Sequence, residues 1–147
     1  MGRVVSVAVG DRPGLVKRPV DVGWLVADHG LEGDRHAGPG PRQLSLLDQA
    51  VVDALHAQGI RVEPGLLGEN LTLSGVALDE LRPGARLRVG TALIEITEIR
   101  QPCRSVLQVD SRALRALIGR AGQMARVVGS GEVRRGDPVE RIEGVYV

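Results

Sequence analysis

Alternating apolar and polar positions along the chain predict a protein built mainly of short β-strands. The clearest case is residues 85–99, where alternation on both sides of Gly90 predicts a hairpin. Residues 3–9 predict a first strand, with Val5, Val7 and Val9 on one face. Further short strands are expected at residues 19–27, with a bulge at Gly23, and at residues 43–46, 123–128, 132–134 and 138–142, while residues 66–73 are expected to pass from a loop into a strand.

Helical periodicity is confined to two segments. Residues 48–58 carry one apolar stripe, with Asp48 suited to the first turn and Gly59 to the C-terminal stop. Residues 111–120 predict a second helix with Ser111 as its N-cap. Many short strands, glycine-rich turns and two or three helices indicate a mainly β fold, a closed or semi-closed β-barrel. The absence of a linker or repeat predicts a single domain over residues 1–147.

Composition narrows the classes of function. The net charge of +1 gives no electrostatic case for nucleic-acid or membrane binding, and an aromatic content of 1% removes the usual stacking platforms. A single cysteine, no signal peptide and no apolar run of membrane length together predict a cytoplasmic protein.

Lys17 is the sole lysine among 19 basic residues. It lies in a short polar stretch with no visible source of desolvation, so pyridoxal phosphate chemistry is not expected here. The arginines offer planar, bidentate donors that suit phosphates and carboxylates.

The stretch from Gly30 to Gly38 (GLEGDRHAG) places three polar side chains on one glycine-rich loop. Its backbone N–H groups could cradle an anion, with Arg35 and His36 adding charge, and Arg42 follows closely enough to point at the same anion. The alternative is an ordinary turn network in which Asp34 accepts backbone hydrogen bonds.

Two further positions are candidates for chemistry. Asn70 begins a strand and offers both a donor and an acceptor, although it could equally bond its own backbone as a turn residue. Cys103 lies between Arg100 and Arg104, and a nearby cation favours the thiolate, which binds soft metals and attacks electrophiles. The alternative is that Cys103 is a small core residue. The three histidines lack zinc-site spacing.

Together these segments resemble the MOSC family, the domain related to the C-terminal part of molybdenum cofactor sulfurases. The resemblance rests on GLEGDRHAG, GENL at 68–71, the hairpin followed by Arg100-x-Pro102-Cys103, and GEVRRGDPV at 131–139, in that order. The chain resembles a small, free-standing bacterial member. One departure is that larger relatives often carry two cysteines in a Cys-Ser-Arg-Cys stretch, where only Cys103 is present here.

The resemblance implies a β-barrel of the pyruvate-kinase-barrel type and a bound molybdenum cofactor. It implies that Cys103 contacts the metal or its sulfur, and that Arg35, Arg42 and Arg100 bind the phosphate or the pterin. Asn70 would read the pterin edge, and His36 would orient a loop or shuttle a proton. The pyridoxal phosphate association of the family comes from a fused domain that is not expected here.

Three functions follow from the resemblance. The first is an oxidoreductase that reduces N-hydroxylated substrates with electrons from a partner reductase, since the chain shows no flavin, haem or iron–sulfur motif. The second is a non-catalytic carrier, which would pass the molybdenum cofactor, or a persulfide on Cys103, to an accepting enzyme. The third is a domain without any cofactor, in which Cys103 is simply buried.

Overall fold

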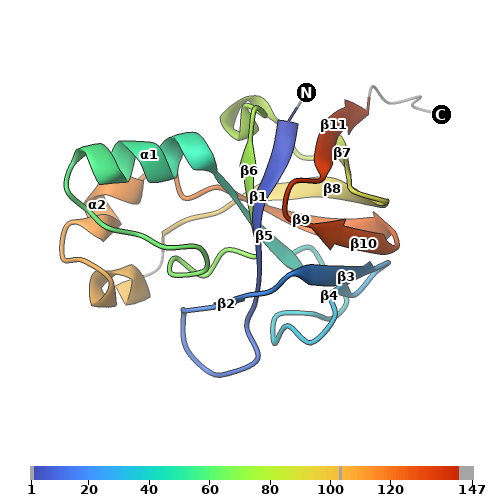
Figure 1. The fold of residues 1–147 in the computed structure, drawn as a ribbon, viewed down its shortest axis with the longest axis horizontal. Coiled ribbons are helices and arrows are strands. Elements are labelled where there is room, and N and C mark those ends of the chain that lie inside the picture. The colour runs from blue at the N-terminus through green and yellow to red at the C-terminus, as the bar shows by residue number, and fades with distance from the viewer. Residues whose placement is uncertain (1, 103, 143–147) are drawn as a thin grey trace.

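The protein forms a closed, mixed β-barrel of seven strands. The computed structural model describes residues 2–102 and 104–142. Around the barrel the order is β11, β7, β8, β9, β5, β6 and β1, and pairing of β1 with β11 closes it (Figure 1). The strands are β1 (Gly2–Val9), β5 (Leu44–Asp48), β6 (Leu71–Ser74), β7 (Arg86–Val89), β8 (Ala92–Ile99), β9 (Gln123–Gly129) and β11 (Pro138–Ile142). The predicted mainly β, closed-barrel fold class is confirmed.

All barrel pairings are antiparallel except that of β5 with β6, which is parallel. A short strand, β2 (Arg18–Pro19), pairs antiparallel with the C-terminal end of β1, at Ala8 and Val9. A separate sheet of three strands lies beside the barrel, in the order β10 (Gly131–Arg134), β3 (Val22–Val26) and β4 (Gly30–Leu31). The predicted 85–99 hairpin is present as β7 and β8.

The helices gather on one side of the barrel (Figure 1). They are α1 (Gln49–Ala57), α2 (Ala113–Leu117) and the 3-10 helix Arg104–Gln108, and a second 3-10 helix spans Leu78–Glu80. Asp48 caps α1 by accepting a hydrogen bond from the Ala50 N–H, and Gly59 takes a φ of 77° just beyond its end, as expected from the sequence.

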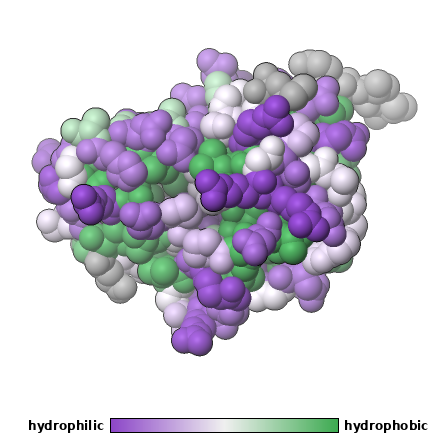
Figure 2. Space-filling view, in the orientation of Figure 1, coloured by the Kyte–Doolittle hydropathy of each residue, from purple (hydrophilic) through white to green (hydrophobic). Residues whose placement is uncertain are grey.

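Two apolar clusters hold the fold together. One fills the barrel and includes Leu25, Leu44 and Leu87, while the other packs under the helices and includes Leu55 and Ile60; all five are fully buried. On the face shown in Figure 2, hydrophilic residues dominate and hydrophobic ones show between them. Within the residues described, no helix is long and apolar enough to cross a membrane.

Three local expectations were wrong. In β1 the register shifts between Val4 and Ser6, so Val4 and Val7 are buried while Val5 is only half-buried. At Gly23 there is no bulge, because β3 pairs with β10 in continuous register through that residue.

The second helix was predicted too long. It spans only Ala113–Leu117, with Arg112 at the N-cap and no side-chain cap. Ser111 therefore does not cap it.

Candidate functional site

A cavity of about 690 Å³ opens where the loop before β5, the end of β8 and the segment before β6 meet, within the size range of small-molecule sites. We call it the basic cavity. It brings together five residues singled out in the sequence: Arg35, His36, Arg42, Asn70 and Arg100. The remaining lining residues are Gly14, Leu15, Lys17, Pro39, Pro41, Gln43, Ser45, Gly68, Gln101, Ser105 and Met124.

Cys103, the predicted metal ligand, lies outside the described residues. Gln101 and Ser105, two positions before and after it in the chain, both line the basic cavity. Within the part of the chain that is described, no group of three or more His, Cys, Asp or Glu residues could hold a metal ion.

The lining of the basic cavity is strongly cationic. Lys17, Arg35, Arg42 and Arg100 all contribute, and none of the described residues that line it is an aspartate or a glutamate. Positive side chains around a concave surface with no carboxylate among them favour an anionic ligand, and guanidinium groups suit phosphate oxygens.

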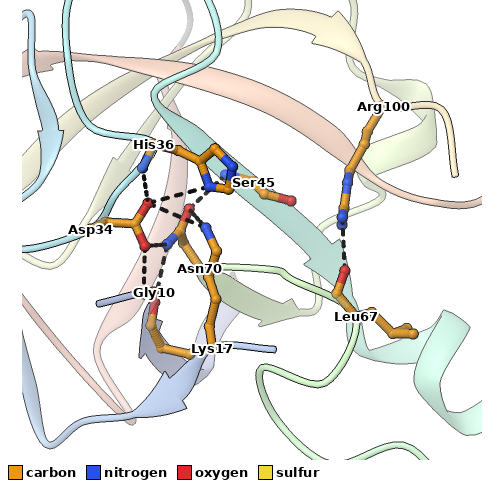
Figure 3. A network of polar contacts seen from close by, with 9 residues as sticks. Gly10, Lys17, Asp34, His36, Ser45, Leu67, Asn70 and Arg100 are labelled. Atoms are coloured by element: carbon orange, nitrogen blue, oxygen red, sulfur yellow. Dashed lines mark hydrogen bonds and ion pairs between the residues drawn. The ribbon is translucent and has the colours of Figure 1, made fainter. Parts of the chain in front are cut away.

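The three arginines differ in how they are held. Arg35 is exposed, and its guanidinium makes no hydrogen bond or ion pair with another described residue. Arg42 is also exposed and pairs with Glu98 at 3.2 Å. The half-buried Arg100 donates from Nη2 to the carbonyl of Leu67 at 2.7 Å, which fixes its guanidinium at the cavity wall (Figure 3). The structure thus offers one positioned guanidinium and two adaptable ones.

The burial of Lys17 differs from what its local sequence predicts. Lys17 was expected to be solvated, but it is 4% exposed and lines the basic cavity. Its Nζ donates to Oδ2 of Asp34 at 3.3 Å and to Oδ1 of Asn70 at 3.2 Å (Figure 3). Burial lowers the pKa of Lys17, the charge of Asp34 opposes that effect, and Arg100 lowers it further. The burial of Lys17 removes the argument that a solvated lysine does not suit pyridoxal phosphate. The expectation that this cofactor is not used now rests on the family resemblance alone.

Asp34 holds this group together from the middle of the glycine-rich loop. Its carboxylate accepts hydrogen bonds from the backbone N–H groups of Gly10 at 2.6 Å and His36 at 3.1 Å, and from Nδ2 of Asn70 at 3.0 Å (Figure 3). The alternative interpretation of the loop, a turn network built on Asp34, is confirmed. The same network also orients Lys17, so the two interpretations of the loop are compatible.

His36 stands at the mouth of the basic cavity with half of its side chain exposed. Its Nδ1 lies 3.8 Å from Oδ2 of Asp34. Desolvation lowers its pKa, the charge of Lys17 lowers it further, and Asp34 acts in the opposite direction. A pKa below the ordinary value of 6.5 leaves the imidazole mainly neutral at pH 7, and a neutral imidazole can both accept and donate a proton.

Asn70 is 1% exposed, and its amide is fully engaged inside the protein. Nδ2 donates to the carbonyl of Ala8 and to Asp34, while Oδ1 accepts from Lys17 and from the N–H of Ser45. A primary amide has only two hydrogens to donate. Asn70 therefore positions Lys17, and reading a heterocycle edge would require it to give up one of these bonds.

Two buried polar atoms of residues that line the basic cavity have no hydrogen-bond partner among the described residues. They are Oγ of Ser45 and Nε2 of Gln43, and the Oε1 of Gln43 is already occupied by the N–H of Val127. Buried polar atoms are normally satisfied, so these two are open to completion by a water molecule or a ligand. Together with the cationic lining, they fit a ligand that is both anionic and rich in polar ring atoms.

Lys17, Gln43 and Ser45 were not among the site residues predicted from the sequence. For Lys17 a signal existed: it is the one lysine in a chain whose other basic residues are all arginine. A compact ammonium fits a space that a guanidinium does not, so a solitary lysine can mark a packed position. Gln43 and Ser45 carry no comparable signal, because neither residue type nor spacing distinguishes them.

Comparison with known proteins identifies the family. The chain resembles the crystal structure of the YuaD protein from Bacillus subtilis, with a TM-score of 0.82, 22% identity, and coverage of 95% of this chain and 94% of that one. It also resembles YiiM from Geobacillus stearothermophilus (TM-score 0.79, 24% identity, 97% and 76% coverage) and YiiM from Escherichia coli (0.69, 24%, 97% and 71%). At these identities the likeness establishes the fold. No curated protein matched the chain. The model of the MOSC domain matches residues 32–140, most of the chain, and the protein therefore belongs to the MOSC domain family.

Proposed function

We propose that the protein binds molybdenum cofactor in the basic cavity and reduces N-hydroxylated compounds with electrons from a partner reductase. The MOSC family is associated with this cofactor. The observation that carries the proposal is the lining of the cavity: four basic side chains, no carboxylate among the described residues that line it, and two unsatisfied polar atoms at its wall.

Different residues of the basic cavity would bind different parts of the cofactor. Arg100, fixed by Leu67, and Lys17, fixed by Asp34, would hold the anionic part of the cofactor at defined places. Arg35 and Arg42 would close over it from the exposed side. Ser45 and Gln43 would bond polar atoms of the pterin in place of Asn70, whose amide is engaged elsewhere.

Cys103 is the proposed metal ligand, because thiolates suit soft metal centres and its chain neighbours Gln101 and Ser105 line the cavity. When bound, the cofactor supplies two-electron redox chemistry at a metal. The overall reaction converts an N-hydroxylated compound, two electrons and two protons into the reduced nitrogen compound and water. His36 would move protons through its imidazole, while Asp34 fixes the backbone of His36 by accepting from its N–H at 3.1 Å.

Cofactor retention is the first test. The protein is purified from a host that makes the cofactor, and bound molybdenum and pterin are measured. We expect near-stoichiometric amounts in the wild type, a large loss in Arg100→Gln, and retention in Arg88→Gln, an exposed arginine of β7 that does not line the cavity. Equal retention in the two variants, or no pterin in the wild type, would contradict the proposal.

Activity is the second test. Loaded protein, a candidate reductase and an N-hydroxylated base should yield the reduced base, and His36→Asn should slow the reaction without changing the molybdenum content. Loss of molybdenum in Cys103→Ser would support the metal-ligand role. Loaded protein that reduces no N-hydroxylated base would favour the carrier function, which a sulfane-sulfur assay on Cys103 then examines.

A cytoplasmic location is part of this proposal and is tested by cell fractionation.

A further inference from the structure

A second cavity, of about 340 Å³, lies at the start of α1, beside the 3-10 helix Leu78–Glu80 and the segment that follows α2. Its lining residues are Asp48, Ala50, Val51, Ala77, Leu78, Asp79, Ile99, Gly119, Arg120, Gly122 and Gln123. None of them lines the basic cavity.

The two cavities lie on either side of the β8–β9 ends. Ile99 of β8 and Gln123 of β9 are cross-strand partners, and both line the second cavity. The residues that follow them, Arg100 and Met124, line the basic cavity. Successive residues of a strand point to opposite faces, so this short strand pair forms a wall shared by the two cavities.

The body of the second cavity is apolar. Ile99 is 60% exposed, and Val51 and Leu78 lie around the same space. A ligand with a compact hydrocarbon part would cover this surface and gain the free energy of its burial.

A buried acceptor without a donor lies in the wall of this cavity. Gln123 is 3% exposed, and its Nε2 donates to the carbonyl of Leu78 and to that of Leu81. Its Oε1 accepts no hydrogen bond from any residue in the described part of the chain. An acceptor in this state is normally satisfied by a donor, and Gln123 is one of the residues that line the cavity.

The charged residues around this cavity are mainly acidic. Asp48 uses Oδ1 to cap α1, and its Oδ2 has no partner among the described residues, while Asp79 is exposed on the 3-10 helix. Arg120, the one basic residue among the described residues of the lining, already donates twice to the carbonyl of Ala116. The charged side chains of the lining are therefore two carboxylates and one guanidinium, the reverse of the basic cavity.

We propose that the second cavity binds a small organic cation that has a compact apolar body and N–H donors, such as an aryl amidine or an arylalkyl ammonium. The hydrocarbon part packs on Ile99 and Val51, and the cationic head donates to the carboxylates and to Oε1 of Gln123. The proposal does not depend on the function of the basic cavity, although a ligand here would press on the wall that carries Arg100.

The probe for this proposal is benzamidine, with neutral benzamide as the matched ligand of similar shape. Titration followed by backbone amide NMR should show saturable shifts at residues 77–79, 99 and 119–123, and benzamide should bind at least about tenfold more weakly because it lacks the charge. Equal binding of the two ligands, shifts elsewhere, or no saturable shift for benzamidine would overturn the proposal.

Variants separate this site from a general charge effect. Asp48→Asn keeps an N-cap acceptor, so its combination with Asp79→Asn should preserve the fold and weaken benzamidine binding about tenfold. Ala77→Leu should block binding by filling the space. Glu63→Gln, which removes an exposed carboxylate outside the cavity, should leave the affinity unchanged. Unchanged affinity in both site variants, with folding confirmed by thermal unfolding, would also overturn the proposal.

Discussion

The ammonium nitrogen of Lys17 lies 3.3 Å from Oδ2 of Asp34, and both side chains are almost completely buried, with 2% and 0% of their area exposed. Asn70 bridges the pair, since its amide bonds one partner through Oδ1 and the other through Nδ2. A buried ion pair is costly to break from one side, because the remaining charge stays desolvated. The pair therefore couples the stability of the glycine-rich loop to the shape of the basic cavity.

The first prediction concerns this pair. Asp34→Ala should lower the free energy of unfolding by about 3–5 kcal/mol, because it leaves the Lys17 ammonium buried with a single acceptor. The double variant Lys17→Met, Asp34→Asn should lose less than the sum of the losses in its own single variants, Lys17→Met and Asp34→Asn, since it removes both charges together. Urea unfolding of the four proteins gives the coupling free energy.

Arg18→Ala is the matched control, because Arg18 also pairs with an aspartate, Asp11 at 3.1 Å, but does so in solvent. Its unfolding midpoint should stay close to that of the wild type. Additive effects of the Lys17 and Asp34 changes would show that the two charges do not stabilise one another.

The sequence predicted what depends on local pattern. The hairpin of β7 and β8 follows from strict alternation and a glycine with positive φ at the turn, and α1 follows from its apolar stripe and its Asp48 cap. The clustering of Arg35 and Arg42 follows from their nearness in the chain. Arg100 could be added only through the family resemblance, because its place beside that loop is set by barrel closure.

What the sequence did not predict depends on contacts between distant segments. Lys17 is desolvated by Asp34 and Asn70, which lie 17 and 53 positions away, so a polar local sequence concealed its burial. The prediction that Val5, Val7 and Val9 share one face of β1 was wrong for a different reason. A register shift after Val4 changes which side chains face the core, and such shifts arise from pairing with β6 rather than from β1 itself.

Gly23 carries the second prediction. A Cβ there would lie 2.8 Å from Cδ1 of Leu31 and 3.0 Å from Cγ1 of Val7, both in the packed core of the barrel and its side sheet. Gly23→Ala should therefore cost about 1–3 kcal/mol through overpacking, measured by thermal or urea unfolding. In Gly129→Ala, whose Cβ would meet only Leu93 at 3.3 Å, the loss should be smaller. If the two variants lose the same stability, the close approach at Gly23 is not the cause.

Glu69 carries the third prediction, a pH dependence. Glu69 is 2% exposed, and burial raises its pKa above the ordinary value of 4.5, while hydrogen bonds from Thr72 and backbone N–H groups oppose the shift. Between 4.5 and the higher folded pKa, the folded state holds a proton that the unfolded state has released. Stability relative to a non-titrating variant is therefore lost as pH rises through this window.

Glu69→Gln tests that sign, because glutamine keeps the shape and does not titrate. Paired urea unfolding at several pH values from 4 upward should show the wild type losing stability relative to Glu69→Gln as pH rises. A difference that is constant with pH would mean that hydrogen bonding at Glu69 balances its desolvation, and one that changes in the wild type's favour would mean that hydrogen bonding outweighs it.

Arg112 carries the last prediction, because one exposed side chain joins the two helices. Its guanidinium donates to the carbonyls of Gln58 and Gly59, just beyond the end of α1, at 2.9 and 3.1 Å. It also donates to the carboxylate of Asp110, and these hydrogen bonds hold the pKa of Asp110 at about 2, below the ordinary value of 3.8. One residue thus satisfies two carbonyls of the turn that follows α1 and fixes the segment before α2.

Removing the guanidinium should change both contacts at once. In Arg112→Ala the pKa of Asp110 should rise from about 2 toward 3.8 in an NMR titration, and amides in the last turn of α1 should exchange with solvent faster. Arg115→Ala, an exposed arginine within α2, should change neither quantity. A shifted pKa with unchanged exchange would mean that other contacts, such as packing of Leu55 and Ile60 in the core under the helices, are sufficient to hold the end of α1.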